Sequence, residues 1–227
     1  MPFTQDQSIK TCYISDSNII EIGVDEVGRG PLFGRVYTAG VILSKDNPNI
    51  DYTMMKDSKK FTSEKKLRQA YEYIKDNCID YVVNYESEET IDDINILQAT
   101  QKSMHKCVQQ LIERNNLVHE TTLLLIDGNY FKPHEMWNKE TQFMQPFQHE
   151  CVKGGDALYS SIAAASIIAK VSRDDYIIEL CKENPELDER YSLSSNKGYG
   201  SKKHRDGIKE YGITQWHRKT FGICKSF

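Results

Sequence analysis

The sequence has no long hydrophobic run and no apolar segment near its first residues. Its longest stretch of small and apolar residues covers positions 162–169 and stops at Lys170, which is far too short to span a bilayer. Residues 1–10 are polar and lack the apolar core of a secretory signal. We therefore expect a cytoplasmic protein that does not contact a membrane.

The sequence also lacks paired cysteine motifs and an excess of positive charge. None of its six cysteines stands in a C-x-x-C spacing, which argues against zinc knuckles and redox pairs and favours reduced thiols. The formal net charge of −4 argues against a protein that coats nucleic acid by charge alone, because such binders are usually basic. Local basic patches remain, and each is more often a solvated face than a phosphate contact. They lie at 59–60, 65–66, 202–205 and 217–219.

With 227 residues the chain fits one domain with an extension. Residues 1–18 are polar and aperiodic, so we expect a loosely held tail. Residues 19–183 alternate apolar strands with helices, which indicates an α/β fold with a mixed sheet. Residues 184–227 begin at Asn184-Pro185 and form a separate polar, then basic and aromatic, extension. We expect strands over 19–24, 35–43, 79–85, 121–126 and 148–152, helices over 62–77, from 91 to about 115 and from Ala157, and irregular structure over 130–148.

Acidic residues follow three of these strands. Asp25 and Glu26 come at the end of the first apolar run and lead into a glycine-rich turn, Asp127 follows the strand at 121–126, and Asp156 follows the strand at 148–152. Adjacent residues of a regular strand point to opposite faces. Asp25 and Glu26 can therefore serve one site only if the strand breaks its alternation, and residues 27–31 supply such a break.

Carboxylates at separate strand ends can converge at the carboxyl edge of an open α/β sheet. Oxygen ligands of this kind suit Mg²⁺ or Mn²⁺, and two such ions can drive hydrolysis of a phosphodiester. The residues alone leave other readings open. Asp127 before Gly-Asn is a common turn acid, and Asp156 is equally compatible with the N-cap of the following helix.

Six short motifs occur in order along residues 19–222. They are G-V-D-E-V-G-R-G-P at 23–31, D-S-K-K at 57–60, N-I-L-Q-A-T at 95–100, I-D-G-N at 126–129, G-D at 155–156 with S-I-A-A-A-S-I-I-A-K-V at 161–171, and K-G-Y-G at 197–200 with His204. Together they resemble the ordered motifs of the ribonuclease HII family. The resemblance implies an RNase H-like mixed sheet flanked by helices, with a C-terminal helical extension. It also implies endonucleolytic cleavage of RNA in RNA/DNA hybrids and at ribonucleotides embedded in duplex DNA, with Mg²⁺ or Mn²⁺.

The resemblance also assigns roles by position. It implies that the catalytic and metal-binding acids are Asp25, Glu26, Asp127 and Asp156, and that the substrate is bound by Gly28, Arg29, Gly30, Lys59 and Tyr199. In the family the glycine loop reads the ribose 2′-OH through its backbone, and the tyrosine stacks on the sugar at the RNA–DNA junction. An arginine between the glycines favours type HII over type HIII. We expect a monomer that nicks 5′ to the ribonucleotide and leaves 5′-phosphate and 3′-hydroxyl ends.

Two features differ from the family pattern, and two other classes of protein share parts of it. The span from Asp127 to Asp156 is longer than in typical bacterial members, and Gly154 stands where we expect lysine. A module that binds hybrids without cutting them would need basic loops but not four acids. A nuclease specific for DNA would need the acids but no sensor of the 2′-OH, so residues 28–30 and Tyr199 argue against it.

Overall fold

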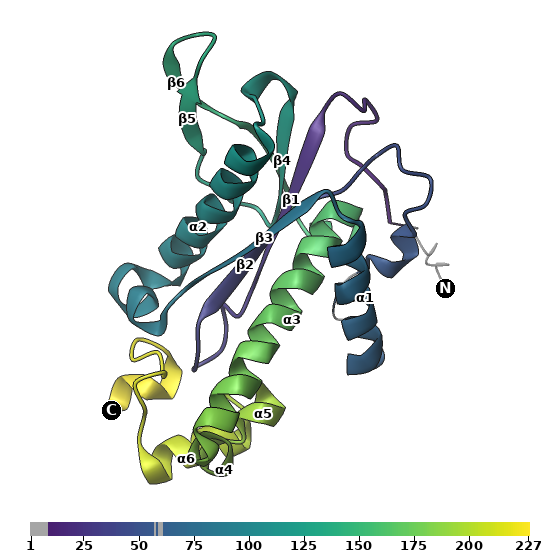
Figure 1. Ribbon diagram of the computed structural model, residues 1–227. Coiled ribbons are helices and arrows are strands. Elements are labelled where there is room, and N and C mark those ends of the chain that lie inside the picture. Colours follow the sequence, from purple (N-terminus) through teal and green to yellow (C-terminus); the bar gives the residue numbers. More distant parts are fainter. Residues whose placement is uncertain (1–8, 57, 59–60) are drawn as a thin grey trace, which may run out of the picture.

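The computed structural model describes residues 9–56, 58 and 61–227 and shows a mixed five-stranded sheet in the order β3-β2-β1-β4-β7 (Figure 1). β1 pairs antiparallel with β2, and β2 pairs antiparallel with β3. β4 runs parallel to β1, and β7 runs parallel to β4. The strands are β1 Ile20–Val27, β2 Val36–Ile42, β3 Asp80–Glu86, β4 Thr122–Asp127 and β7 Gln148–Val152. This is the mixed α/β sheet that the sequence predicts.

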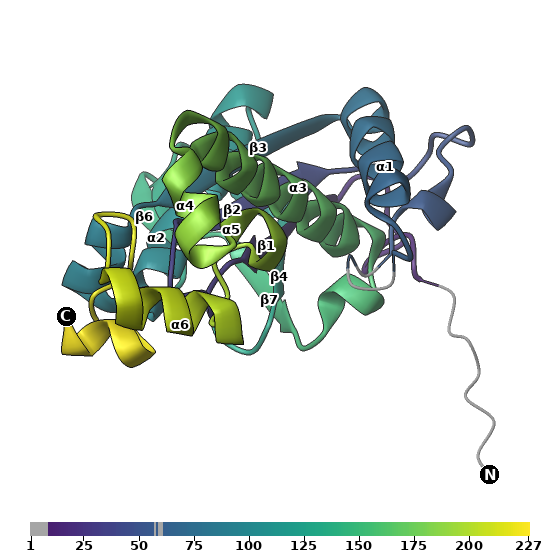
Figure 2. The same cartoon turned by 90° about the horizontal axis from the view of Figure 1, so that it is seen from below.

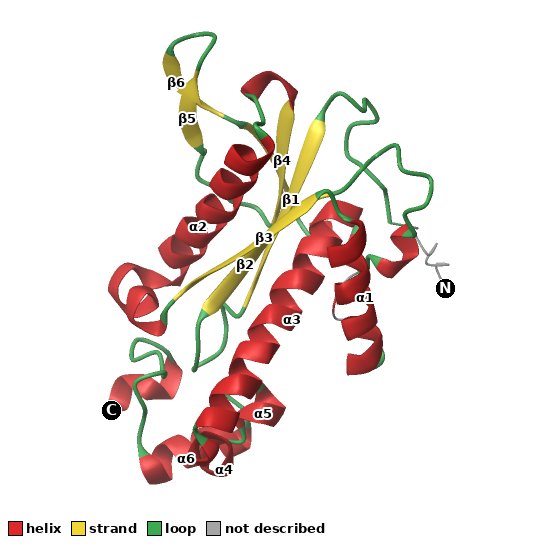
Figure 3. Ribbon diagram, viewed as in Figure 1, coloured by secondary structure: helices red, strands yellow, loops and turns green. Residues whose placement is uncertain are grey.

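Helices cover both faces of the sheet (Figure 3). α2 (Glu88–Asn115) packs on one face, where Met104 and Leu111 join the buried strand residues. α3 (Ser160–Glu183) and α1 (Glu64–Asn77) cover the other face. The small residues of α3 let it lie directly against β1, because a Cβ added at Gly23 would come within 2.2 Å of the Ser161 carbonyl carbon. α3 is therefore fixed against the strand that carries the first two acids.

The polar segment after Asn184 folds into short helices at the far end of α3 (Figure 2). These are α4 Pro185–Tyr191, α5 Leu193–Asn196 and α6 Lys202–Tyr211. Leu187 and Tyr191 share a buried cluster with Leu32 and Phe33, which belong to the loop that follows β1. The predicted C-terminal helical extension is thus confirmed, and it packs on the loop beside the first acids. The 3-10 helices that can be bounded within the described residues are Tyr52–Met54, His119–Thr121, Gly155–Ala157 and Gly222–Ser226.

The prediction that residues 130–148 are irregular was wrong. β5 (Glu135–Asn138) and β6 (Phe143–Pro146) pair antiparallel and form a hairpin that projects beyond the main sheet (Figure 1). Each strand has only four residues, and the apolar Trp137 and Phe143 are exposed whereas the buried Asn138 is polar, so the sequence does not show the alternation of a half-buried strand. The hairpin accounts for much of the long span between Asp127 and Asp156.

Two predicted boundaries shift in ways that affect the site. β1 continues through Val27 instead of ending before Asp25, because its pairing with β2 runs on to the partners Val27 and Tyr37. The helix expected from Ala157 begins at Ser160 and follows a separate 3-10 turn.

Part of the predicted tail is attached to the core. The Lys10 amide donates to the Leu158 carbonyl over 2.9 Å, and the Glu21 carboxylate accepts from the amides of Tyr13 and Ile14. Residues 10–14 are therefore held rather than loose. Across the described stretches of the chain, every helix is too short or too polar to cross a membrane.

Candidate active site

The acids predicted at three strand ends meet at one edge of the sheet. β1, β4 and β7 run parallel, with Val24 paired to Ile126 and Asp127 paired to Val152, so their carboxyl ends coincide. A cavity of about 220 Å³ lies at this edge. It is lined by Asp25, Glu26, Val27, Ser58, Asp127, Asp156, Ser166, Lys170 and Tyr199. The structure thus brings together all four candidate acids and the candidate tyrosine.

A hydrogen bond joins the last two acid-bearing segments. Asp127 Oδ1 accepts from the Gly155 amide over 2.7 Å. A side chain at Gly155 would collide with this arrangement, since an added Cβ would lie 2.5 Å from Ile162 Cδ1. Asp156 belongs to the 3-10 turn, whereas the N-cap of α3 is Tyr159. The reading of Asp156 as the N-cap of the long helix is therefore wrong, and the turn places it beside Asp127.

Asp25 is the most buried of the four candidate acids, with an exposed fraction of 4%. Burial raises the pKa of Asp25 well above its usual range, and the charges of Glu26 and Asp127 raise it further. The Ser166 hydroxyl and the Glu26 amide oppose this by hydrogen bonding to the carboxylate. Burial also raises the pKa of Glu26, while Arg29, 3.3 Å away, lowers it. The site therefore concentrates negative charge that a cation would neutralise.

Both Asp25 and Glu26 line the cavity although they are consecutive in β1. The pairing of β1 with β4 ends at Val24, while the pairing with β2 continues past both acids. Asp25 and Glu26 therefore lie where β1 still pairs with β2 but no longer pairs with β4. The break in strand alternation that we predicted at 27–31 comes only after both acids.

The donor chemistry of the cavity suits a hard divalent cation. Its acidic ligands are all carboxylates, which Mg²⁺ and Mn²⁺ prefer over the nitrogen and sulfur ligands of zinc. Over residues 9–56, 58 and 61–227, no three His, Cys, Asp or Glu side chains are close enough to form a ready-made cage. Mg²⁺ commonly keeps several waters and uses few carboxylates together with substrate phosphates. The oxygens of Asp25, Glu26, Asp127 and Asp156 are the groups present that fit such an ion.

The glycine loop and the tyrosine lie side by side at the rim of the cavity. A Cβ added at Gly30 would be 3.7 Å from Tyr199 Cε1, so the loop backbone faces the edge of the ring. Gly28 adopts a positive φ of 89°, and a Cβ there would lie 2.2 Å from Arg173 Nε. The rings and side chains of Tyr199 and Arg29 are about half exposed. Lys59 lies outside the described residues.

Several residues around this rim escaped the sequence analysis. Arg173 and Arg218 are fully buried, although residues 217–219 looked like a solvated basic patch. Ser166, on α3, hydrogen bonds to Asp25; it lies within the motif at 161–171, but the sequence analysis gave it no role. The signal for Arg173 was its place on a helix whose other inward positions are small or apolar. For Arg218 we find no signal in the spacing of the residues.

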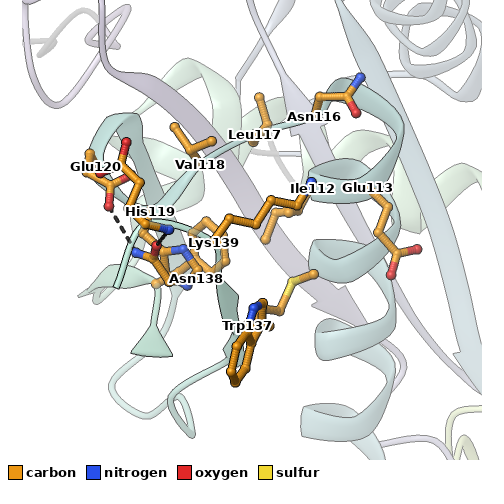
Figure 4. A pocket seen from close by; sticks show the side chains of 13 residues that line it. Ile112, Glu113, Asn116, Leu117, Val118, His119, Glu120, Trp137, Asn138 and Lys139 are labelled. Carbon is orange, nitrogen blue, oxygen red and sulfur yellow. Dashed lines mark hydrogen bonds between the residues drawn. The ribbon is translucent and has the colours of Figure 1, made fainter. Parts of the chain in front are cut away.

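A second cavity, of about 360 Å³, lies between the end of α2 and the β5–β6 hairpin (Figure 4). Ile112, Leu117 and Trp137 line it together with the carboxylates of Glu113 and Glu120. It contains none of the four predicted acids and none of the glycine loop. The chemistry predicted from the sequence is therefore located in the smaller cavity at the sheet edge.

Comparisons with known proteins point to one family. A family model described as ribonuclease HII matches residues 22–224. Ribonuclease HII of Parabacteroides distasonis is 45% identical over 204 residues and covers 90% of both chains. The crystal structure of ribonuclease H2 from Pyrococcus horikoshii has a TM-score of 0.67 at 22% identity and covers 92% of this chain and 96% of that chain. Bst-RNase HIII in complex with Mn²⁺ has a TM-score of 0.61 at 15% identity and covers 86% of this chain and 70% of that chain. At these identities the two structures show a shared fold.

Proposed function

This chain belongs to the ribonuclease HII family and is an endonucleolytic ribonuclease H of RNA/DNA hybrids, and from that premise we propose that it also nicks duplex DNA 5′ to embedded ribonucleotides. The reaction is hydrolysis assisted by two divalent ions, and it leaves 5′-phosphate and 3′-hydroxyl ends. The observation that carries the proposal is the single cavity that holds four carboxylates beside Tyr199 and the 28–30 loop.

In this proposal Asp25, Glu26, Asp127 and Asp156 are the catalytic acids and bind Mg²⁺ or Mn²⁺. When held by these carboxylates, two such ions would activate a water and neutralise the charge that develops on the leaving 3′-oxygen. Bst-RNase HIII binds Mn²⁺ in its crystal structure, which supports the choice of ion. Asp25 must be ionised to bind a cation, so Ser166 and the Glu26 amide assist by stabilising its charged form.

Recognition depends on the 2′-OH, the group that separates RNA from DNA. We assign it to the backbone of Gly28, Arg29 and Gly30, with the Tyr199 ring stacked on the adjoining sugar. We also assign substrate binding to Lys59, as the resemblance implies. Residues 184–227 act as the substrate-binding extension of a catalytic core over 19–183. We also propose that the protein acts as a monomer.

A single substrate tests the proposal. The protein is treated with EDTA and then incubated with a duplex that contains one ribonucleotide, with Mg²⁺, Mn²⁺ or Zn²⁺ added separately. We expect nicking 5′ to the ribonucleotide with Mg²⁺ or Mn²⁺ and none without metal. The all-DNA duplex of the same sequence is the control. Cutting of that control, cleavage on the 3′ side, or recovery with Zn²⁺ alone would contradict the proposal.

A further inference from the structure

The C-terminal segment returns to the site at two consecutive residues, His217 and Arg218. The Arg218 amide donates to the Leu32 carbonyl over 2.8 Å, and the Gly34 amide donates to the Trp216 carbonyl over 2.9 Å. The segment is therefore fixed by its backbone to the loop that follows β1. Its two side chains reach different parts of the substrate rim.

The Arg218 side chain hydrogen bonds to the backbone of the glycine loop from the protein interior. It is fully buried, and its guanidinium donates to the carbonyls of Gly28 over 2.6 Å, Arg29 over 3.0 Å and Gly34 over 2.8 Å. Burial and, to a smaller extent, the charge of the nearby Arg173 lower the pKa of Arg218 to about 9. A buried charge of this kind is tolerated only when its donors are satisfied, and here backbone carbonyls satisfy them.

These hydrogen bonds decide which way the loop presents its amides. In a trans peptide the carbonyl and the following N–H lie in one plane and point in opposite directions. Because Arg218 draws the Gly28 and Arg29 carbonyls inward, the amides of Arg29 and Gly30 point away from it. The loop thereby offers donors on the side opposite to the buried guanidinium.

The His217 side chain reaches Tyr199 through His204. The Thr214 amide donates to His217 Nδ1 over 2.9 Å, so the proton of neutral His217 is on Nε2. His217 Nε2 then donates to His204 Nε2 over 3.1 Å, which places the His204 proton on Nδ1. His204 Nδ1 donates to the Tyr199 carbonyl over 2.9 Å. Burial lowers the pKa of both histidines, that of His217 to about 3, so both rings are neutral. The three hydrogen bonds then fix which ring nitrogen of each histidine carries the proton.

We propose that His217 and Arg218 form one positioning unit that sets the Gly28–Arg29–Gly30 backbone and Tyr199 relative to each other, so that both contact the same ribonucleotide. The inference rests on the proposed function and adds the residues that fix its specificity. Arg173 supports the unit, because its guanidinium donates to the carbonyls of Phe33, Arg35 and Lys197 and so joins the two loops a second time.

The test compares Arg218→Met with Ile208→Ala in the full chain. Ile208 is fully buried on α6 in the same C-terminal cluster and serves as a matched control for lost stability. Circular dichroism gives the Tm of each variant, and assays are run well below the lowest Tm. On the single-ribonucleotide duplex we expect kcat/KM of Arg218→Met to fall about 30-fold or more, as expected when charged hydrogen bonds are lost. Ile208→Ala should retain its activity there.

Binding distinguishes positioning from general damage. In an Asp127→Asn background, Kd is measured for the ribonucleotide duplex and for the all-DNA duplex of the same sequence. We expect Arg218→Met to bring the two values together, Ile208→Ala to keep them apart, and Arg218→Lys to fall between. An unchanged preference in Arg218→Met, or an equal loss in Ile208→Ala, would overturn the inference. If the wild type fails to cut the ribonucleotide duplex, the proposed function itself fails instead.

Two further comparisons apply even if Arg218→Met does not fold. His204→Leu removes the donor to the Tyr199 carbonyl, whereas His204→Asn keeps an amide near the same place, so only His204→Leu should lose the ribonucleotide preference.

Arg218→Lys combined with Tyr199→Ala should lose less activity than the product of the single losses, because both act on one nucleotide. The positioning unit would be contradicted by an equal ribonucleotide preference in the two His204 variants. It would also be contradicted if the activity losses of Arg218→Lys and Tyr199→Ala simply multiplied in the double variant.

Discussion

The acid cluster and the recognition rim lie next to each other but are held in different ways. The acids stand on the ends of β1 and β4 and on the turn after β7, where the hydrogen bonds of the sheet set their positions. The Gly28–Gly30 loop and Tyr199 are held by the buried side chains of Arg173, Arg218 and His204. Regular backbone thus positions the chemistry, and buried polar side chains position the recognition. We expect the two capacities to be separable by mutation.

The largest effect should come from the acids, with binding left intact. Asp127→Asn removes a charge from the site but keeps a side-chain oxygen that can accept from the Gly155 amide. We expect cleavage to fall by about three orders of magnitude or more, because the lost ligand stabilises the transition state. Hybrid affinity, measured by fluorescence anisotropy, should change little. Activity near that of the wild type would remove Asp127 from the catalytic set.

A smaller effect should separate two glycines of the same loop. Gly28→Ala places a methyl group 2.2 Å from Arg173 Nε at a φ of 89°, so Arg173 and the loop must both move. Gly30→Ala meets only the edge of Tyr199 at 3.7 Å, an ordinary contact. Since a displacement of about 1 Å can cost roughly 100-fold in rate, we expect a loss of that order in kcat/KM for Gly28→Ala. Gly30→Ala should lose much less, and equal losses would mean that backbone position is not what matters at Gly28.

The smallest effect concerns thermal stability: we expect one substitution in the site to raise the Tm, whereas most substitutions lower it. Since the folded pKa of Asp25 is raised, ionising it destabilises the fold at pH above its unfolded pKa of about 3.9. Asp25→Asn should therefore have a higher Tm than the wild type at pH 7 without metal. The gain should shrink as the pH falls toward 3, where the wild-type carboxyl is protonated in both states. Saturating Mg²⁺ should also shrink it by stabilising the wild type, and a lower Tm at pH 7 would contradict the reasoning.

The same contrast explains what the sequence could predict. Apolar runs that end in Asp25 and Asp127 give the strands, their order of alternation with helices gives a mixed α/β sheet, and parallel strand ends bring the acids together. The role of Arg218 could not be predicted, because its three partners are backbone carbonyls far away in the sequence. Carbonyl groups are present at every residue, so they leave no mark in the sequence. The β5–β6 hairpin was missed because the apolar Trp137 and Phe143 are exposed while the buried Asn138 is polar, which reverses the pattern of a half-buried strand.

The bond between Gly28 and Arg218 joins residues 190 positions apart, and this has a consequence for the timing of synthesis. At about 5–20 residues per second, a ribosome needs roughly 10–40 s to make the chain between them. By the end of that interval the strands that carry Asp25 and Asp127 have both been made, while the loop that follows β1 still lacks its buried guanidinium. The strands that carry these two acids are therefore made before the side chain that positions the glycine loop, and that loop can reach its final arrangement only after Arg218 has been added.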